Sequence, residues 1–493
     1  MRYKYRFSEL GKVPFALEYD DITLVSRYSE LPPKYEISLE TYLTNKIKLN
    51  GPLLSSPMPN VTGPEMCIAL GLTGNMGVLP KTMSIDEQVA QGKRVKRYSS
   101  GFITDPVVLS PEDSISRALE IKREMGFSTI PVTHDGTPHG KLEGLLVKYA
   151  YSERYKDEKV KDRMLTFEEL EEKGILHYRR PSLPEAEEIM RQNNFGKLVI
   201  VDEEGNLDSI ATWADVSTRE EHPYALLDKD GRIMYGAAVG GPGRVEDLEE
   251  RAKRLIEEAK VDVIFVETAQ ADSMGVMELT KKILEDYTQS YDIPVVWGNI
   301  DNRKSAERLI SKCCESRDAI KVGIGPGSIC TTREVTGFGV PQLTAVYECS
   351  EVAREYGVRT VADGGLGNTA SKASGNIIKA LCAGADACML GGLFAGTDEA
   401  PGEVIEVEGR KMKRYYGMAS VEGLKRGGGT RYYENIKDAV VQGKEIMVPY
   451  VGSVYDVIYE VEKNLKYSMR VHANAKNIKE LKDADLEFVI KIK

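Results

Sequence analysis

The amino-acid sequence predicts an α/β fold, a (β/α)8 barrel with a smaller module inserted into it. From Gly51 onward, short β-rich runs that end in glycine or polar residues alternate with stretches of helical periodicity, as in parallel-sheet proteins. Eight such runs can be counted, and eight β/α units within about 250–300 residues are typical of a TIM barrel. More than 150 residues separate the second run from the third. Because an ordinary connection between neighbouring elements is far shorter, this gap indicates an insertion.

The eight candidate strands are short and mostly apolar. They lie at residues 51–58, 74–80, 233–239, 261–267, 293–299, 319–325, 359–365 and 387–392. The stretch 245–261, between the third and the fourth of them, repeats apolar residues at helical spacing. We therefore expect an amphipathic helix in that connection.

The inserted stretch contains a self-similar pair of segments. Ser128–Gly136 (STIPVTHDG) and Lys197–Gly205 (KLVIVDEEG) end in glycines that are 69 residues apart. Each follows a stretch of helical periodicity, residues 115–127 in the first copy and 185–196 in the second. A helix, a buried strand and a turn, used twice, allow a small pseudo-symmetric module to bury its two open faces. Tandem CBS domains have this shape, and an insertion that only stabilises an oligomer is the alternative.

The bulk composition argues against membrane, nucleic-acid and zinc-dependent functions. The chain of 493 residues has a formal net charge of −10 and no basic stretch with interleaved aromatic residues. No apolar run approaches the ~20 residues that cross a bilayer, and residues 1–10 carry charges where a secretory signal needs apolar residues. The five histidines lack the spacing of zinc ligands. We expect a cytoplasmic protein that binds neither membranes nor nucleic acids.

Among the seven cysteines, Cys330 has unusual surroundings. The cysteines show no paired spacing, which indicates reduced thiols, and those in the runs MCIAL and ALCAGADACML suit an apolar core. Cys330 instead lies on the glycine-rich segment Gly323–Gln342, between hydroxyl residues and before Arg333. Backbone donors and a nearby cation favour a thiolate, and glycines let the loop move. On these residues alone, a nucleophile and an inert thiol both remain open.

Five consecutive predicted strands end in polar or glycine-rich residues. In a TIM barrel these ends meet on one rim, which is where the active site lies. The strand ends in question are Glu267-Thr268, Asn299, the cysteine loop, Asp363-Gly364-Gly365 and Gly391-Gly392. Loops after the seventh and eighth strands commonly bind phosphate, because glycine lets backbone N–H groups approach an anion. Although DGG alone would suit an ordinary turn, its position here predicts a phosphorylated ligand.

These motifs together resemble the IMP dehydrogenase/GMP reductase family over essentially the whole chain. The resemblance rests on GIGPGSICTTR (323–333), DGG (363–365), YYGMAS (415–420) and GFITDPVVLSPED (101–113), and on the place of the insertion between the second and third barrel units. It implies that residues 1–100 form the first part of a catalytic barrel and 101–220 a tandem CBS regulatory module. Residues 221–493 would form the second part, with a mobile flap near 420–450.

The resemblance implies NAD-dependent oxidation of inosine 5'-monophosphate (IMP) to xanthosine 5'-monophosphate (XMP), a step of guanine nucleotide synthesis. Cys330 would attack C2 of the purine, a hydride would pass to NAD, and a covalent thioimidate would remain to be hydrolysed. Thr332 matches the family's catalytic-loop threonine. Arg431 and Tyr432 match a flap pair that activates water in the dehydrogenases, and an arginine shielded from bulk water could serve as the base. An exposed loop pair without a role is the alternative for these two residues.

The resemblance also implies the residues that bind the ligands. Substrate contacts are expected from Ser56, Met58, Asn299, Ser328, Asp363, Gly364, Gly365, Gly391, Gly392, Tyr415, Gly417, Met418 and Gln442. Dinucleotide contacts are expected from Glu267, Thr268, Gly323 and Gly325, and potassium contacts from the carbonyls of Gly325, Gly327 and Cys330. Purine nucleotides would bind the CBS module, and the family's usual assembly is a tetramer that can pair into an octamer.

Several residues depart from the dehydrogenase pattern. Glu267 stands where the family usually has aspartate and Ala271 where glycine is common, so the dinucleotide site is expected to be altered. The C-terminus, DLEFVIKIK, lacks the glycine-rich tail that completes potassium binding, which leaves potassium dependence open. YGMAS, GGLFAGTDEAPGE and PQLTAVYEC lean toward GMP reductase, which reductively deaminates GMP with NADPH, whereas Arg431-Tyr432 leans toward the dehydrogenase. A catalytically idle nucleotide sensor is a third reading, and the retained catalytic residues argue against it.

Overall fold

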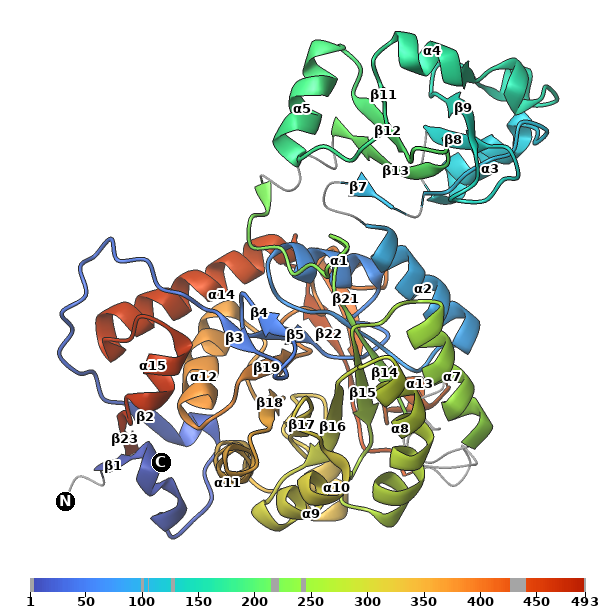
Figure 1. Cartoon of the computed structure of the whole chain (residues 1–493). Coiled ribbons are helices and arrows are strands. Elements are labelled where there is room, and N and C mark those ends of the chain that lie inside the picture. The colour runs from blue at the N-terminus through green and yellow to red at the C-terminus, as the bar shows by residue number, and fades with distance from the viewer. Residues whose placement is uncertain are drawn as a thin grey trace. The chain divides into compact units, whose positions relative to one another are not determined.

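The computed structural model describes residues 4–98, 102–104, 106–125, 129–213, 221–240, 245–425 and 440–491. The chain forms two compact units. One comprises residues 1–96, 224–226 and 233–493, and the other comprises 97–223 and 227–232. Figure 1 shows the first unit as a sheet surrounded by helices and the second as a smaller α+β unit.

The larger unit contains a closed parallel barrel. Its sheet has eight strands in the order β5-β19-β18-β17-β16-β15-β14-β6, and every neighbouring pair is parallel. The strands are β5 (Leu53–Ser55), β6 (Val78–Leu79), β14 (Gly236–Val239), β15 (Val263–Glu267), β16 (Val295–Ile300), β17 (Ala319–Val322), β18 (Arg359–Asp363) and β19 (Ala387–Leu390). The barrel closes where Leu54 pairs with Met76, and the amide of Ser55 donates to the Met76 carbonyl at 3.2 Å. All eight predicted strands are present, which confirms the (β/α)8 fold.

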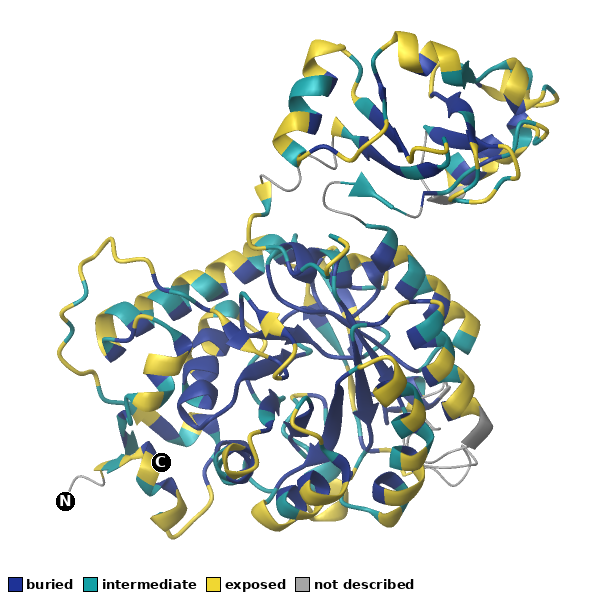
Figure 2. Ribbon diagram, viewed as in Figure 1, coloured by how far each residue is buried: buried dark blue, intermediate teal, exposed yellow. Residues whose placement is uncertain are grey.

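Helices cover the outside of the barrel. They are α1 (Pro64–Leu72), α2 (Ile85–Arg97), α7 (Val245–Glu257), α8 (Lys281–Ser290), α9 (Arg303–Cys313), α11 (Gln342–Glu355), α12 (Ala370–Cys382) and α14 (Val454–Ser468). Helix α7 fulfils the expectation of an amphipathic helix: Leu248, Ala252, Leu255 and Ile256 recur at helical spacing and are buried. Figure 2 shows the same division for the other outer helices, with buried residues toward the sheet and exposed residues outward.

Shorter elements flank the barrel. A hairpin of β3 (Thr41–Tyr42) and β4 (Lys48–Leu49) lies at its amino-terminal end, and the strands β1 (Lys4–Arg6), β23 (Glu487–Ile490) and β2 (Ile22–Leu24) form a sheet that joins both ends of the chain. A third sheet contains β20 (Ile405–Val407), β21 (Arg410–Tyr416) and β22 (Glu445–Pro449). The remaining helical elements are η1 (Phe7–Lys12), η2 (Tyr19–Asp21), α10 (Thr332–Thr336), α13 (Val421–Lys425), α15 (Ile478–Asp483) and π-helical turns at Gly275–Thr280 and Met469–Ala473.

Apolar side chains fill the barrel interior. Val263 and Phe265 of β15 point inward at alternate positions, as do Ala387 and Met389 of β19, and all four belong to one buried cluster. Leu43, Ile47 and Leu49 from the β3–β4 hairpin complete this cluster. The Thr41 hydroxyl donates to the carbonyl of Asp386, just before β19, at 2.7 Å. The hairpin therefore closes the amino-terminal end of the barrel and leaves the opposite rim for ligands.

Three aspartates join neighbouring strands at the amino-terminal end of the barrel. Asp262, Asp318 and Asp386 immediately precede β15, β17 and β19. Their carboxylates accept hydrogen bonds from the backbone amides of Tyr235 (2.8 Å), Val295 (2.8 Å) and Thr360 (2.9 Å), the residues directly across on the neighbouring strand. Each aspartate thus satisfies an amide that the ladder leaves unpaired at a strand end. We call these three contacts the aspartate staples.

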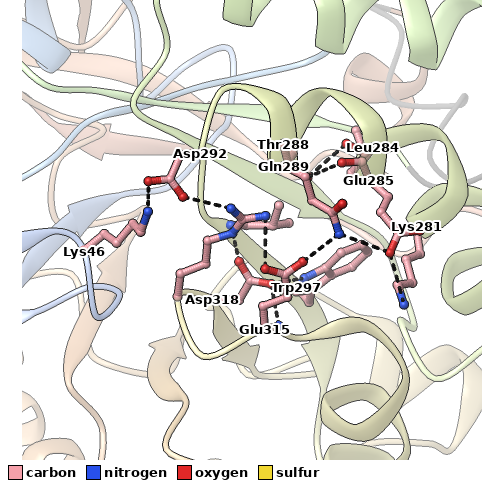
Figure 3. A network of polar contacts seen from close by, with 12 residues as sticks. Lys46, Lys281, Leu284, Glu285, Thr288, Gln289, Asp292, Trp297, Glu315 and Asp318 are labelled. Carbon is pink, nitrogen blue, oxygen red and sulfur yellow. Dashed lines mark hydrogen bonds and ion pairs between the residues drawn. The ribbon is translucent and has the colours of Figure 1, made fainter.

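The staple at Asp318 belongs to a wider polar network, which Figure 3 shows. Its second carboxylate oxygen accepts the amide of Glu315 at 2.9 Å. Burial raises the pKa of Asp318 above its usual range, and the backbone hydrogen bonds act in the opposite direction. Nearby, Arg317 donates to Asp292 at 2.9 Å, and Asp292 also pairs with Lys46. This network fixes the start of β16 and β17 and ties the β3–β4 region to them.

The smaller unit has two similar halves. The first half contains α3 (Ile115–Met125), β8 (Ile130–Thr133) and β9 (Leu142–Leu146), and the second contains α5 (Leu183–Gln192), β12 (Lys197–Val201) and β13 (Leu207–Thr212). In both halves the antiparallel pairing shifts register at the end of the first strand, at Thr133 opposite Leu142 and at Val201 opposite Leu207. The other elements are β7 (Phe102–Ile103), β10 (Leu165–Thr166), α4 (Phe167–Glu172), β11 (Leu176–His177) and single turns η3 (Glu153–Tyr155) and η4 (Val160–Asp162).

The two halves make reciprocal contacts. The amide of Leu142 donates to Gly205 and that of Leu207 donates to Gly140, both at 3.0 Å. Edge strands are also exchanged: β10, which precedes the second half, pairs with β9, whereas β7, which precedes the first half, pairs with β13. One buried cluster contains residues from both β9 and β13. The halves are therefore related by an approximate two-fold axis and share a core.

Among the residues that the structure describes, none of the helices combines the length and the apolar composition that a membrane-spanning helix needs.

We predict that Phe265→Ala lowers the free energy of unfolding of the barrel by about 3–5 kcal/mol, because it leaves a large cavity in the interior cluster. The measurement is urea unfolding followed by the fluorescence of Trp297 in a Trp213→Phe background. Phe15→Ala, at a position 53% exposed, is the control and should change stability by less than about 0.5 kcal/mol. Equal effects of the two substitutions would contradict this account of the core.

Candidate active site

A cavity of about 600 Å³ opens at the carboxyl-terminal rim of the barrel, a size within the usual range for small-molecule sites. Nearly all of the sequence-predicted site residues line it together: Ser56, Met58, Glu267, Asn299, Gly323, Gly325, Gly327, Ser328, Cys330, Thr332, Asp363, Gly364, Gly365, Gly391, Gly392, Tyr415, Gly417, Met418 and Gln442. Thr268 is not among the lining residues, and its hydroxyl donates to the Gly298 carbonyl at 2.7 Å. Arg431 and Tyr432 lie outside the described residues.

The strand order determines the order in which the loops lie along the rim of the cavity. The glycine pairs follow β18 and β19, the cysteine loop follows β17, and Glu267 ends β15. Because neighbouring strands in this order are adjacent on the rim, the cysteine loop lies between the glycine pairs and Glu267. A long ligand that reaches from the glycine pairs to Glu267 would therefore pass the sulfur of Cys330.

Cys330 presents its sulfur to the cavity beside a hydroxyl. The Cys330 Sγ and Thr332 Oγ1 atoms are 3.1 Å apart, and Cys330 is half-buried. Other cysteines are enclosed: burial raises the pKa of Cys382 to about 12 and that of Cys67 well above its usual range. Those thiols stay protonated at neutral pH, whereas Cys330 has a hydroxyl neighbour and faces the cavity.

Backbone pairing with a distant segment holds the cysteine loop. Cys330 pairs with Gly443 as an antiparallel bridge. The amide of Thr331 donates to the Gln442 carbonyl at 3.0 Å, and that of Lys444 donates to the Ile329 carbonyl at 2.8 Å. The position of the sulfur is therefore coupled to residues 442–444, more than 100 residues further along the chain.

Arg333 anchors the loop and does not act as the cation that the sequence pattern places beside the thiol. Its guanidinium donates to the carbonyls of Ile324 (2.8 Å) and Val340 (2.5 Å) and forms an ion pair with Glu18. The other carboxylate oxygen of Glu18 accepts the amide of Gln342 at 2.7 Å. Because the guanidinium is already hydrogen-bonded to two carbonyls and paired with Glu18, the expectation that Arg333 stabilises the Cys330 thiolate directly is wrong.

The two glycine pairs shape a corner suited to an anion. Gly364 and Gly365 have φ angles of +86° and +74°, a backbone conformation that residues other than glycine rarely adopt. A Cβ on Gly391 would lie 2.6 Å from the Tyr415 hydroxyl, so glycine lets that hydroxyl reach the corner. Burial, together with Asp363 and Cys330 nearby, raises the pKa of Tyr415 well above its usual range. Its phenol therefore keeps its proton and remains a donor.

A buried lysine that the sequence analysis missed organises the polar groups of the cavity. Lys321, on β17, is fully buried. Its ammonium lies 2.6 Å from Asp363 Oδ2 and 2.7 Å from Glu267 Oε1 and also donates to Asn299. The Asn299 side chain in turn donates to Asp363 at 2.8 Å. The Glu267 carboxylate, at the end of β15, thus belongs to this cluster. The one sequence signal was a lysine inside the otherwise apolar strand AIKV.

Other lining residues carried no motif. Glu18, Tyr19 and Asp20 come from the N-terminal segment, before the first barrel strand. Asn368 comes from the loop before α12, and Lys372 comes from the first turn of that helix. The Asp20 carboxylate pairs with Lys372 at 2.8 Å, and this contact lowers the pKa of Asp20. Spacing along the chain could not place these residues at the rim, because tertiary packing brings them there.

Comparison with known proteins agrees with this geometry. A family model described as IMP dehydrogenase / GMP reductase domain matches residues 16–492. The inosine-5'-monophosphate dehydrogenase of Aquifex aeolicus is 39% identical in an alignment of 482 residues that covers 96% of this chain and 92% of that protein. The enzyme of the same name from Methanocaldococcus jannaschii is 40% identical in an alignment of 484 residues that covers 95% of this chain and 91% of that protein.

Solved structures of a second kind of enzyme share the fold. A cysteine-to-alanine variant of GMP reductase from Trypanosoma brucei, in complex with guanosine 5'-monophosphate, has a TM-score of 0.85 and 32% identity and covers 98% of this chain and 97% of its own. The same reductase with guanosine 5'-triphosphate has a TM-score of 0.77 and 30% identity, with 99% and 100% covered. The chain therefore belongs to the IMP dehydrogenase / GMP reductase family and is an oxidoreductase, as the motifs predict.

We predict that Lys321→Met destabilises the protein by about 3–5 kcal/mol, because the buried Glu267 and the partly buried Asp363 lose the ammonium between their carboxylates. Thermal unfolding measures the loss. Adding Glu267→Gln should recover part of it, since one carboxylate charge is then removed, whereas the exposed control Lys282→Met should stay within about 0.5 kcal/mol of wild type. An unchanged melting temperature in Lys321→Met would show that the ion cluster does not stabilise the barrel.

Proposed function

We propose that the protein oxidises IMP to XMP with NAD, in guanine nucleotide synthesis. The observation that carries the proposal is the single cavity that holds the Cys330 sulfur, the Thr332 hydroxyl and both glycine pairs. The direction of the reaction rests on the relatives described above, since those with 39% and 40% identity are named as dehydrogenases. The corner formed by Gly364-Gly365, Gly391-Gly392 and Tyr415, which we call the anion corner, would bind the 5'-phosphate. Asp363 would accept hydrogen bonds from the ribose hydroxyls.

The covalent steps follow from the place of the sulfur. The Cys330 thiolate attacks C2 of the purine and forms a C–S bond, and the hydrogen on C2 leaves with its electron pair, so that IMP loses two electrons. The resulting thioimidate keeps the nucleotide attached to the loop. Water then adds to C2, the C–S bond breaks, and XMP and the free thiol are released. Thr332, 3.1 Å from the sulfur, is placed to exchange protons or hydrogen bonds with the groups at C2.

The wall at the ends of β15 and β17 fits a dinucleotide. Glu267, Gly323 and Gly325 line the cavity there, and the Glu267 carboxylate can accept hydrogen bonds from ribose hydroxyls as well as from Lys321. Bound NAD supplies the two-electron acceptor for the hydrogen that leaves C2. The protein's own contribution is to hold the purine between Cys330 and this wall and to exclude water until the oxidation is complete.

Carbonyl oxygens on the cysteine loop suit a potassium ion. Gly325 and Gly327 line the cavity, and backbone carbonyls are the donors that hard monovalent cations prefer. The Gly327 carbonyl also accepts the Cys330 amide at 3.0 Å, which leaves its second lone pair for an ion. With the Cys330 carbonyl, these groups would hold potassium and stiffen the loop that carries the nucleophile.

Arg431 and Tyr432 are proposed to activate the water of the hydrolytic step. Residues 442–444, which begin ten positions after Tyr432 in the sequence, are hydrogen-bonded to the cysteine loop, and this closeness along the chain supports the proposal. In a site closed to solvent, an arginine whose neutral form is stabilised by a tyrosine can take a proton from water. This role belongs to the dehydrogenase direction and has no counterpart in a reductive deamination.

We further propose that the smaller unit is a tandem CBS module, residues 101–220 in the sequence-based boundaries, that binds purine nucleotides and regulates the barrel. Its support is the approximate two-fold relation and the exchanged strands β7 and β10. The solved reductase with guanosine 5'-triphosphate is a relative of this whole chain that binds a purine triphosphate. Assembly into tetramers that pair into octamers, and a cytoplasmic location, remain expectations of the family resemblance.

A second candidate function is GMP reduction with NADPH, with loss of ammonia. The reductase structures, at TM-scores of 0.85 and 0.77, favour it, as do the sequence features YGMAS and the double glycine Gly391-Gly392. The cavity, the cysteine and the anion corner serve either reaction. The two functions differ in the direction of electron flow and in the need for water activation.

We predict that absorbance at 340 nm rises when the full chain is mixed with IMP, NAD and potassium. Cys330→Ala should lower this rate by at least about 10³-fold, because the covalent step is lost. Cys314→Ala, outside the cavity, is the matched control and should retain the wild-type rate. A fall in absorbance with GMP and NADPH, and no response to IMP, would instead assign the reductase function.

We predict that Arg431→Ala separates oxidation from hydrolysis. The first turnover should still produce one NADH per active site as a burst in stopped-flow absorbance, and the steady rate should fall by about 10²–10⁴-fold. The covalent nucleotide should then accumulate and be visible in the intact mass of the protein. Arg410→Ala, exposed on β21, is the control. A variant that loses the burst as well as the steady rate would contradict a role limited to water activation.

A further inference from the structure

The loop between β18 and α12 brings an asparagine into the anion corner. Asn368 lines the cavity. Its Nδ2 donates to Ser328 Oγ at 3.1 Å, and its Oδ1 lies 3.3 Å from the same hydroxyl. The contact links the loop after β18 to the cysteine loop after β17. No glycine or cysteine motif marks Asn368 in the sequence.

Gly392, in the loop after the neighbouring strand β19, makes room for this side chain. A Cβ on Gly392 would lie 2.1 Å from Asn368 Oδ1 and 2.7 Å from Asn368 Cγ, distances that exclude any side chain there while Asn368 keeps its place. The next nearest atom is Cε1 of Tyr415, at 3.3 Å. The Asn368 amide thus fills the space that a side chain at position 392 would otherwise occupy, between Ser328 and Tyr415.

The surroundings favour a negatively charged ligand. The loop leads directly into α12, a helix of thirteen residues capped by Thr369, whose first turn begins at this edge of the cavity. Lys372 also lines the cavity, where its ammonium pairs with Asp20 at 2.8 Å, and Gly367, with a φ of +112°, lets the loop fold over the stem of that lysine. An asparagine amide carries two N–H groups, and the bond to Ser328 uses one of them.

We infer that Asn368 is a substrate-binding residue that donates a hydrogen bond to the 5'-phosphate of the nucleotide. Gly392 has no side chain to offer, and Asn368 supplies a polar group to the same corner from the neighbouring loop. This inference rests on the proposed function, because it takes the bound ligand to be a purine nucleoside 5'-monophosphate. It adds a specificity residue to the phosphate contacts expected from Ser328, Tyr415 and the glycine amides.

The first test measures the Kd of the full chain for IMP by titration calorimetry, without dinucleotide. Asn368→Ala should raise the Kd by about ten-fold, the loss expected for one hydrogen bond to a charged group. Ser371→Ala, exposed on the first turn of α12 and not part of the cavity lining, is the matched control and should bind as wild type does. An unchanged Kd in Asn368→Ala would overturn the inference.

A double-mutant cycle with Ser328 distinguishes direct contact from support of a neighbour. If Asn368 touches the phosphate, Asn368→Ala should still raise the Kd about ten-fold in a Ser328→Ala background. If Asn368 only orients the Ser328 hydroxyl, the second substitution should have no further effect, and the proposed contact would be wrong. Both proteins keep the backbone of the corner, so the comparison does not depend on the glycine amides.

Gly392 offers a reciprocal test. Gly392→Ser alone should weaken IMP binding, because the new side chain collides with Asn368. In the Asn368→Ala background that space is empty, so Gly392→Ser should restore part of the lost affinity by placing a hydroxyl at the same point. Binding that worsens in both backgrounds would show that the two positions do not share one polar role.

The outcomes also separate this inference from the proposed function. If the wild-type chain binds neither IMP nor GMP, the nucleotide site itself is wrong. If it binds either nucleotide while Asn368→Ala binds with the same Kd, only the role of Asn368 is overturned. The readout needs no turnover, so it holds for both directions of the reaction.

Discussion

Closure of the parallel sheet is the constraint on which the rest of the structure depends. The pairing of Leu54 with Met76 joins β5 to the segment that leads into β6, and parallel neighbours throughout the barrel bring every strand's carboxyl end to one rim. The cysteine loop and both glycine pairs meet only because of this geometry. The apolar interior and the β3–β4 hairpin occupy the other end of the barrel. Closure of the parallel sheet therefore produces both the packed amino-terminal end and the polar carboxyl-terminal rim.

At the rim, the buried ammonium of Lys321 provides the hydrogen bonds that water would otherwise donate to the neighbouring polar groups. Lys321 contacts Glu267, Asn299 and Asp363, groups assigned here to both the dinucleotide wall and the nucleotide ribose. Two carboxylates share one ammonium, so their remaining oxygen lone pairs can accept hydrogen bonds from hydroxyl groups of a ligand. Because the three partners share one cation, a ligand that changes one contact also changes the others. The polar floor of the cavity thus behaves as one unit.

The sequence predicted the barrel well because its signals are local. Runs such as VDVIFVE indicate buried strands on their own, and the position of DGG after the seventh run is enough to predict its place at the rim. Lys321 was missed because a lysine within an apolar strand has no local signature of its partners. Glu18 and Asn368 were missed because only tertiary packing brings them to the cavity. Arg333 was assigned a role beside the thiol from its spacing, although Glu18 and two carbonyls determine where its guanidinium lies.

The aspartate staples have a consequence for how this barrel can change. Each one joins a strand to its predecessor, so β14 with β15, β16 with β17 and β18 with β19 form bonded pairs at the base. At its base the barrel therefore carries extra hydrogen bonds in two-strand steps, and the loops that line the cavity lie at the other end. A loop at the rim, such as the one that carries Asn368, can be lengthened or reshaped while the fastening beneath it stays intact. Substrate preference and foldability can thus diverge in this scaffold by changes at opposite ends of the same strands.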